Sequence, residues 1–74
     1  MLNANNHINY LKDYYTEGSE VVNLVMRKGF PIPPGTYGIV HHVDDVGRIH
    51  VCWDNGVRYP LTPGIDLFAK VIYE

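Results

Sequence analysis

Four histidines and one cysteine are the side chains of this 74-residue chain that suggest a metal ion. Imidazole and thiolate are preferred zinc ligands, and a structural zinc site needs four ligands in a tetrahedral array. His41 and His50 are expected to be cross-strand neighbours on an outer sheet face, with Cys52 two residues along it. No CxxC or HxxxH spacing and no obvious fourth ligand accompany them, so we predict no metal and no cofactor. Two protonated imidazoles at close range would repel each other, which predicts mild acid sensitivity.

The aspartates have structural explanations that need no catalysis. Asp44 and Asp45 fall in a predicted turn, where aspartate is favoured because it binds its own backbone. Asp54 has a similar place in a second turn, and Asp66 is expected to cap a short helical turn. No Ser–His–Asp or Cys–His set, P-loop or dinucleotide motif is present. We therefore expect the protein not to be an enzyme.

The basic residues offer one alternative function, nucleic-acid binding. Six Lys and Arg face eight Asp and Glu, giving a net charge of −2. Domains that follow a phosphate backbone are usually basic overall, so the charge balance disfavours this function. The alternative would depend on tyrosines that stack on bases beside four basic residues, Arg27, Lys28, Arg48 and Arg58.

Aromatic residues favour a protein-binding function. One Trp, six Tyr and two Phe exceed what so small a core can readily enclose. Tyrosine combines a large contact area with few rotatable bonds and is enriched at interfaces. Tyr10 and Tyr14 lie one helical turn apart, Phe30 and Ile32 lie in a proline-stiffened loop, and Tyr37 flanks the sheet. These five residues are the predicted partner-binding residues of a non-enzymatic module that acts by protein–protein contact.

The N-terminal segment is predicted to form a short amphipathic helix. Ile8, Leu11 and Tyr15 recur at steps of three and four over residues 6–15, and Gly18 follows as a helix stop. About ten residues are too few to form a stable helix alone in water. The apolar stripe must therefore dock, either on the rest of this chain or on a partner chain or second copy.

Strands and turns dominate after residue 17. The first predicted strand is followed by a long loop with three prolines, and a short helical turn over residues 62–68 precedes the last. We predict a mainly β fold, with a helical segment over residues 1–17 and a small five-stranded SH3-like barrel over 18–74. The predicted strands are residues 21–26, 37–43, 48–53, 57–61 and 69–73.

The second hairpin allows its register to be predicted. A two-residue turn over Asn55–Gly56 would pair Val51 with Pro60 and split the apolar residues between the two faces. A bulged loop over 54–56, with Gly56 in the left-handed position, puts them all on one face. We therefore predict the bulged loop, which pairs Trp53 with Val57, Val51 with Tyr59 and Ile49 with Leu61.

For the first hairpin we predict a tight turn over residues 44–47. This register pairs Val43 with Arg48, His42 with Ile49 and His41 with His50.

A glycine inside the strand before that turn is unusual. Gly38, Val40 and His42 would then share the face of Ile49 and Val51. A glycine within a strand often marks the close approach of a backbone or a large ring. We expect the indole of Trp53 to pack against Gly38.

Linked motifs give the chain a family resemblance. The stretches PGTYGIV (34–40), VDD (43–45), GRIHVCWDNG (47–56) and PGID (63–66) follow a pattern P-G-T-x-G-x-V, V-x-W-D-N-G and P-G-x-D. The chain resembles, over roughly residues 18–68, a family of small domains of unknown function that are common on bacterial prophages, plasmids and conjugative elements. The resemblance implies an SH3-like barrel and an accessory role, such as inhibiting or adapting a host complex.

A fainter resemblance is to Mind-bomb-type domains, which share G-x-V, V-x-W-D-x-G and a final D-L, here Asp66–Leu67. Those domains are SH3-like and bind peptides. The helix over residues 6–15 lies outside both sets of motifs.

The location of the protein is predicted from what the chain lacks. No apolar run approaches the roughly 18 residues of a membrane helix, and residues 1–6 do not resemble a signal peptide. The lone Cys52 cannot form an internal disulfide, which suits a reducing compartment. We expect a soluble, cytoplasmic protein.

Overall fold

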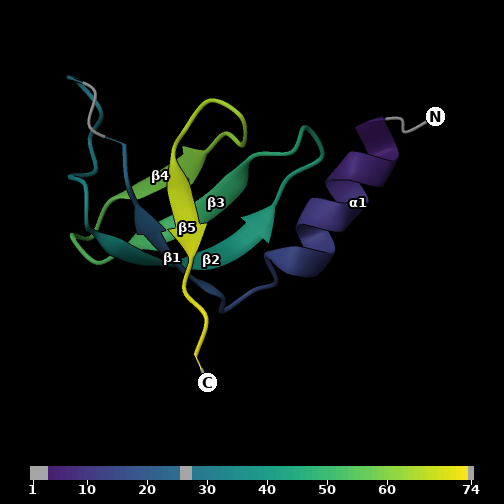
Figure 1. The fold of residues 1–74 in the computed structure, drawn as a ribbon, viewed down its shortest axis with the longest axis horizontal. Coiled ribbons are helices and arrows are strands. Elements are labelled where there is room, and N and C mark those ends of the chain that lie inside the picture. Colours follow the sequence, from purple (N-terminus) through teal and green to yellow (C-terminus); the bar gives the residue numbers. More distant parts are fainter. Residues whose placement is uncertain (1–3, 26–27, 74) are drawn as a thin grey trace.

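The computed structural model describes residues 4–25 and 28–73, and the side chains from residue 7 onward in these ranges. The chain is mainly β, as predicted (Figure 1). One helix precedes five strands: α1 (Ala4–Tyr14), β1 (Glu20–Asn23), β2 (Tyr37–Val43), β3 (Ile49–Trp53), β4 (Arg58–Leu61) and β5 (Phe68–Lys70).

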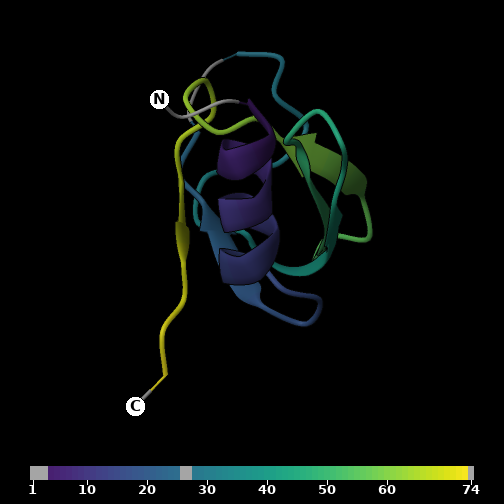
Figure 2. The same ribbon diagram turned by 90° about the vertical axis from the view of Figure 1, so that its right-hand side faces the viewer.

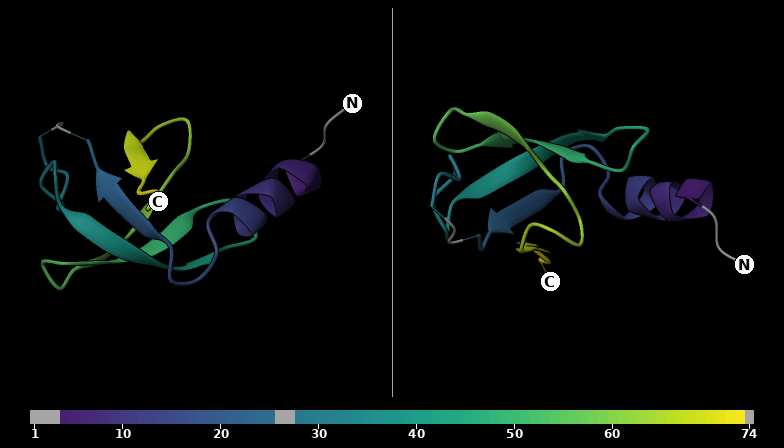
Figure 3. Two further views of the ribbon diagram at one scale, coloured as in Figure 1. Left: turned by 60° about the horizontal axis from the view of Figure 1, so that its bottom comes forward. Right: turned by 90° about the horizontal axis from the view of Figure 1, so that it is seen from above.

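The five strands form one antiparallel sheet in the order β4-β3-β2-β1-β5. The sheet is strongly curled, so that β1 and β5 lie across from β3 and β4 (Figures 1 and 3). Within the described ranges no hydrogen bonds join the edge strands β4 and β5, so the predicted barrel is not closed. Two features explain the open edges. β5 has three residues rather than the predicted five, and Pro60 in β4 has no N–H to donate.

The concave face of the sheet carries the hydrophobic core. Gly38, Val40 and Val43 of β2 are buried, as are Ile49, Val51 and Trp53 of β3. Leu11 of α1 and Ile32 of the loop between β1 and β2 complete the core. The buried cluster contains Leu11, Val21, Ile32, Val40, Val43, Ile49, Val51, Trp53 and Leu61.

The predicted register of the second hairpin is confirmed. Ile49 pairs with Leu61 and Val51 with Tyr59. The loop is closed by hydrogen bonds from Trp53 N to Val57 O (2.9 Å) and from Gly56 N to Trp53 O (2.9 Å). Gly56 has a φ of 86°, the left-handed conformation that a bulged loop requires.

The predicted register of the first hairpin is wrong. Val43 pairs with Ile49 and His42 with His50, whereas Val40 pairs with Val51. Asp44 N donates to Arg48 O (3.0 Å) and Gly47 N to Asp44 O (3.1 Å), which are the same two bonds as in the second hairpin. A bulge between Val40 and His42 then restores Val40 to the inner face.

The packing of Trp53 on Gly38 is confirmed. A Cβ atom at Gly38 would lie 2.5 Å from Val51 Cγ1 and 2.8 Å from Trp53 Cε3. Only glycine leaves room there for the indole.

The helix docks on its own chain, at the end of the sheet where the β2–β3 hairpin turns (Figure 2). Leu11 is 5% exposed and joins the core. Lys12 Nζ lies 2.9 Å from Asp45 Oδ1 in the hairpin turn. The ring of Tyr15 packs on Phe68 of β5, with centroids 5.8 Å apart.

Asn23 ends β1 earlier than predicted. Its side chain is fully buried, and Nδ2 donates to Ile32 O (2.8 Å) while Oδ1 accepts from Val25 N (3.1 Å). The main chain of Asn23 also bonds to Thr36 and Gly35 on the far side of the loop. Because of these bonds the chain leaves the strand after Asn23, and the loop is held so that Ile32 lies in the core. Leu24 and Val25, which were predicted to continue the strand, lie outside it, and residue 26, the last of the predicted strand, lies outside the described residues.

Candidate binding surface on the outer face of the sheet

The convex face of the sheet, which we call the outer face, is apolar at its centre. Tyr37 and Ile39 of β2 alternate with the buried Gly38 and Val40, so both point outward. They are 45% and 43% exposed although β2 has a strand on either side. Tyr37 pairs with Val22 of β1, and Ile39 pairs with Cys52 of β3.

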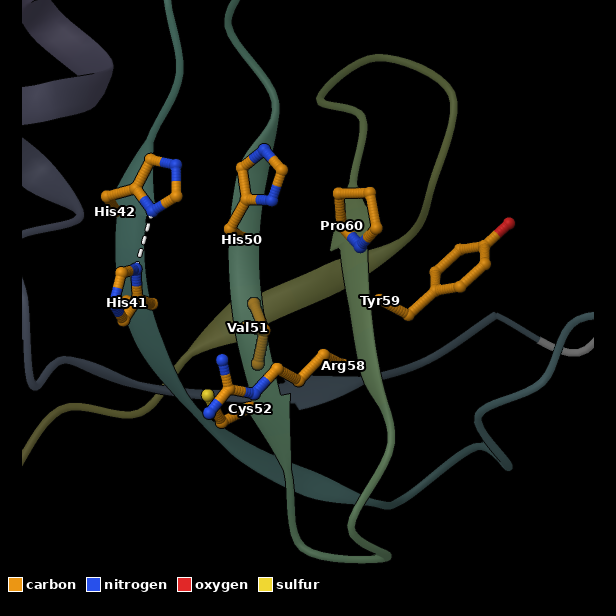
Figure 4. Close-up of a pocket in the computed structure, with 8 residues that line it drawn as sticks. All are labelled: His41, His42, His50, Val51, Cys52, Arg58, Tyr59 and Pro60. Atoms are coloured by element: carbon orange, nitrogen blue, oxygen red, sulfur yellow. Dashed lines mark hydrogen bonds between the residues drawn. The ribbon is translucent and has the colours of Figure 1, made fainter.

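The bulge in β2 places two consecutive histidines on the exposed side of the strand. His41 and His42 are both exposed, and His42 pairs with His50 across to β3. The rings of His42 and His50 are stacked, with centroids 4.4 Å apart and planes at 6°. His41 Nδ1 lies 2.6 Å from His42 Nδ1 (Figure 4). One of these two atoms must donate to the other, so they share one proton.

Asp44 anchors this cluster at the start of the hairpin turn. Its Oδ2 lies 2.8 Å from His50 Nε2 and 3.2 Å from Arg48 Nε, and its Oδ1 accepts from Val46 N and Arg48 N. Partial desolvation alone would raise the pKa of Asp44. The hydrogen bonds from His50, Arg48 and Val46, together with the Arg48 charge, outweigh it and hold the pKa well below its usual range.

A shallow pocket of about 170 Å³ lies beside the histidines on β3 and β4. Arg58 of β4 extends its guanidinium back over β3 to the side of Cys52 (Figure 4). Among the described residues, no acidic side chain pairs with the Arg58 guanidinium. The pocket, called here the histidine–arginine pocket, is lined by His41, His42, His50, Val51, Cys52, Arg58, Tyr59 and Pro60.

A second hollow of about 380 Å³ lies on the other side of the same histidines. It separates them from the end of α1 and the turn that follows, and Glu17 lines it. The histidine pair therefore faces an arginine on one side and a carboxylate on the other. The lining residues are Lys12, Tyr15, Thr16, Glu17, His41, His42 and Val43.

The five predicted partner-binding residues do not form one surface. Tyr10 and Tyr14 are 61% and 39% exposed on α1, with stacked rings 6.0 Å apart, whereas Tyr37 lies on the outer face. Phe30 is half-buried against Tyr59, with centroids 5.1 Å apart. Ile32 is 1% exposed, so its prediction as a partner contact is wrong. The hydrogen bond from Asn23 Nδ2 to Ile32 O holds the loop over the core, and the Ile32 side chain is buried there.

Three of the four basic residues of the nucleic-acid alternative lie in the described part of the chain, in different elements. Arg48 is paired with Asp44, Arg58 lines the pocket, and Lys28 is exposed in the loop after β1. Arg27 lies outside the described residues.

The structure has the turn bonds predicted for Asp44 and Asp66 but not the one predicted for Asp54. Asp44 binds its own turn as expected, and Asp66 Oδ2 accepts from Thr62 N (2.8 Å) in a single helix-like turn closed by Asp66 N to Thr62 O (2.8 Å). In the second turn Asn55 rather than Asp54 accepts the local bond, from Val57 N. Over residues 4–25 and 28–73, no three His, Cys, Asp or Glu side chains are grouped to hold a metal ion.

Sequence reasoning missed the outward Ile39 and the contact between His42 and His50. His41 rather than His42 was expected to pair with His50, because the bulge was not anticipated. A signal for both was present in β2. Apolar residues stand at consecutive positions, Tyr37 to Val40 and again at Val43, so the strand cannot have one polar face.

The comparisons with known proteins identify the family. The model of a family described as a domain of unknown function, DUF4314, matches residues 4–71, and the chain belongs to this family. The match includes α1, which the resemblance drawn from the motifs had left outside. Neither a curated protein nor a solved structure matches the chain significantly. In the described part of the chain, no helix is long and apolar enough to cross a membrane.

Proposed function

We propose that this protein is a non-enzymatic binding module that contacts a partner protein through the outer face of its sheet. The observation that carries the proposal is the exposure of Tyr37 and Ile39 at the centre of the sheet. Antiparallel sheets with one solvated face usually place polar residues outward. Here the solvated face is apolar at its centre and polar toward the histidines.

The arrangement matches the general organisation of protein interfaces. Binding free energy is concentrated in a few central residues, among which tyrosine is enriched, and a polar rim surrounds them. Tyr37 and Ile39, with Val22 beside them, would form the centre. The histidine–arginine pocket lies next to this centre through Cys52, the neighbour of Ile39.

The tyrosines of α1 form a second exposed surface. Tyr14 is held in place because Lys70 Nζ lies 4.3 Å above its ring and donates to its main-chain oxygen (2.6 Å). Tyr10 stacks on it and is the more exposed of the two. A fixed pair of rings could bind a second part of the partner, as the sequence predicted.

The fold and the biological setting are proposed on the resemblance of the motifs. A curled sheet in the order β4-β3-β2-β1-β5 supports an SH3-like fold that is open at one edge. The motif resemblance supports an accessory role on a phage or other mobile element, in which the protein inhibits or adapts a host complex in the cytoplasm.

The nucleic-acid alternative is the weaker proposal because Arg48 is already paired with Asp44. If it held, binding would weaken steeply with salt and would be lost in Arg48→Ala and Arg58→Ala. A gel shift at low salt that shows no complex would remove this alternative.

The proposed function is tested by affinity capture from a host lysate with matched variants. Ile39→Lys places a charge at the centre of the outer face, whereas Ile65→Lys makes the same change at an exposed loop residue. Both should keep the thermal unfolding transition of the wild type. We expect Ile39→Lys to lose the captured protein and Ile65→Lys to retain it.

A parallel pair, Tyr37→Ser and Tyr10→Ser, separates the outer face from the helix. Capture by Ile39→Lys at the wild-type level would contradict the proposed surface. If only Tyr10→Ser lost the captured protein, the partner-binding surface would be on α1 and not on the outer face.

A further inference from the structure

The residues that line the histidine–arginine pocket include one guanidinium and no carboxylate. Arg58 contributes a guanidinium with no acidic partner in the described residues, and three imidazoles line the other side. The nearest carboxylate of the hairpin is Asp44, whose two oxygens already accept from His50, Arg48 and Val46. An anion that enters the pocket would therefore meet an Arg58 guanidinium that no described carboxylate pairs with, whereas His50 Nε2 already bonds to Asp44 and the Nδ1 atoms of His41 and His42 bond to each other.

We propose that this pocket, which Arg58 lines together with His41, His42 and His50, binds a phosphate-type oxyanion presented by the partner as a phosphorylated side chain. This inference rests on the proposed protein-binding function and names the chemistry that the outer face would recognise. Arginine offers several N–H donors in a planar fork that suits a tetrahedral oxyanion.

The size of the pocket limits the ligand. Its volume is about 170 Å³, and a protein cavity of about 150 Å³ holds one benzene molecule. One phosphoryl group with its linking atoms fits this space, and the rest of any larger ligand would lie outside the pocket. The net charge of −2 also opposes a long polyanion and favours a single anionic group.

The histidine contacts make binding depend on pH. His41 and His42 share one proton between their Nδ1 atoms, so a second proton at this contact breaks it and leaves two N–H groups that face and repel each other, one of them on a charged imidazolium ring. An oxyanion between the rings and Arg58 would offset that repulsion. Affinity should therefore rise as the pH falls through the range in which histidine gains its charge.

Other charged groups near the histidines influence the same equilibrium. Glu17 faces the pair across the second hollow and competes with the anion for a protonated ring. Lys12, on the same side, is paired with Asp45, and Glu20, the neighbour of Ile39, accepts a hydrogen bond from Tyr73. The remaining titratable or charged groups around the pockets are Tyr15, Asp44, Arg48, Cys52 and Tyr59.

Sulfate is the probe for the first test, because its charge does not change between pH 5 and pH 8. Histidine ring signals and amide signals are followed by NMR as sulfate is added at pH 5.5 and pH 8. We expect shifts confined to the pocket, with at least about tenfold higher affinity at the lower pH if one imidazolium is required.

Two charge variants locate the site. Arg58→Gln should reduce sulfate affinity about tenfold or more, and His42→Gln should flatten its pH dependence. Lys28→Gln removes the same positive charge from the loop after β1 and should bind sulfate as the wild type does. No shift at the histidines, or equal binding by wild type and Arg58→Gln, would overturn the pocket.

The source of the anion is tested with a short phosphoserine peptide, its unphosphorylated form and a single-stranded oligonucleotide. We expect the phosphopeptide to bind more tightly than the other two and to compete with sulfate. Tighter binding of the oligonucleotide would overturn the assignment to a phosphorylated protein. The sulfate result does not depend on capture of a partner, so failure of the pocket and failure of the proposed function can be told apart.

Discussion

The two faces of the same sheet differ in what their residues do. On the inner face, Val40, Val51 and Trp53 are almost completely buried and pack against one another. On the outer face, Tyr37 and Ile39 occupy neighbouring positions of the same strand and remain nearly half exposed. The comparison teaches that in this chain apolar character alone does not mark the core, because one strand supplies apolar side chains to both faces.

The largest expected effect is the loss of unfolding free energy when a residue of the inner face is removed. Trp53→Ala removes a buried indole whose Nε1 donates to Tyr59 O (2.9 Å) and should lower the free energy of unfolding by about 3–5 kcal/mol. Urea unfolding measures this loss. Tyr37→Ala on the outer face is the control and should cost less than about 1 kcal/mol. Equal losses in the two variants would contradict the division between the faces.

An intermediate effect is expected at the one buried polar residue of the described core. Asn23→Ala leaves the main-chain groups of Val25 and Ile32 without their partner, at a cost of about 1–3 kcal/mol. Asn55→Ala removes a single exposed turn bond and serves as the control, with about 0.5 kcal/mol expected. Thermal unfolding of both variants gives the comparison, and a smaller loss for Asn23→Ala than for Asn55→Ala would contradict the role of Asn23.

The smallest effect concerns acid stability at the polar end of the outer face. Because the pKa of Asp44 is lowered in the folded protein, its stabilisation is present above about pH 4 and is lost as the pH falls further. The side chain is partly solvated, so the contribution should stay below about 1 kcal/mol. Melting temperatures at pH 3 and pH 6 should differ less in Asp44→Asn than in the wild type. If the melting temperatures at pH 3 and pH 6 differed by the same amount in both proteins, Asp44 would not be the source of this acid-dependent stability.

Much of the inner face could be predicted from the sequence. The second hairpin was predictable because only one register puts its apolar residues on one face. The first hairpin was not, since a simple alternation through His42 hides the bulge. The spacing of two residues between Val40 and Val43 was the signal, because both are buried and a regular strand would send them to opposite faces.

The outer face and the loop were harder to predict for a physical reason. Their arrangement depends on contacts between residues distant in sequence, which local patterns do not report. Asn23 is polar and gave no sign that it would organise the loop and bury Ile32. The contact of His42 with His50 depends on the bulge, so an error of one residue in register changed which histidines meet.

The measurement that tests the account most directly is an NMR map of the protein bound to its captured partner. The account predicts that the largest changes in chemical shift fall on the outer face, at Tyr37, Ile39, His42 and His50. Changes confined to Tyr10 and Tyr14 of α1, with the outer face unaffected, would contradict it.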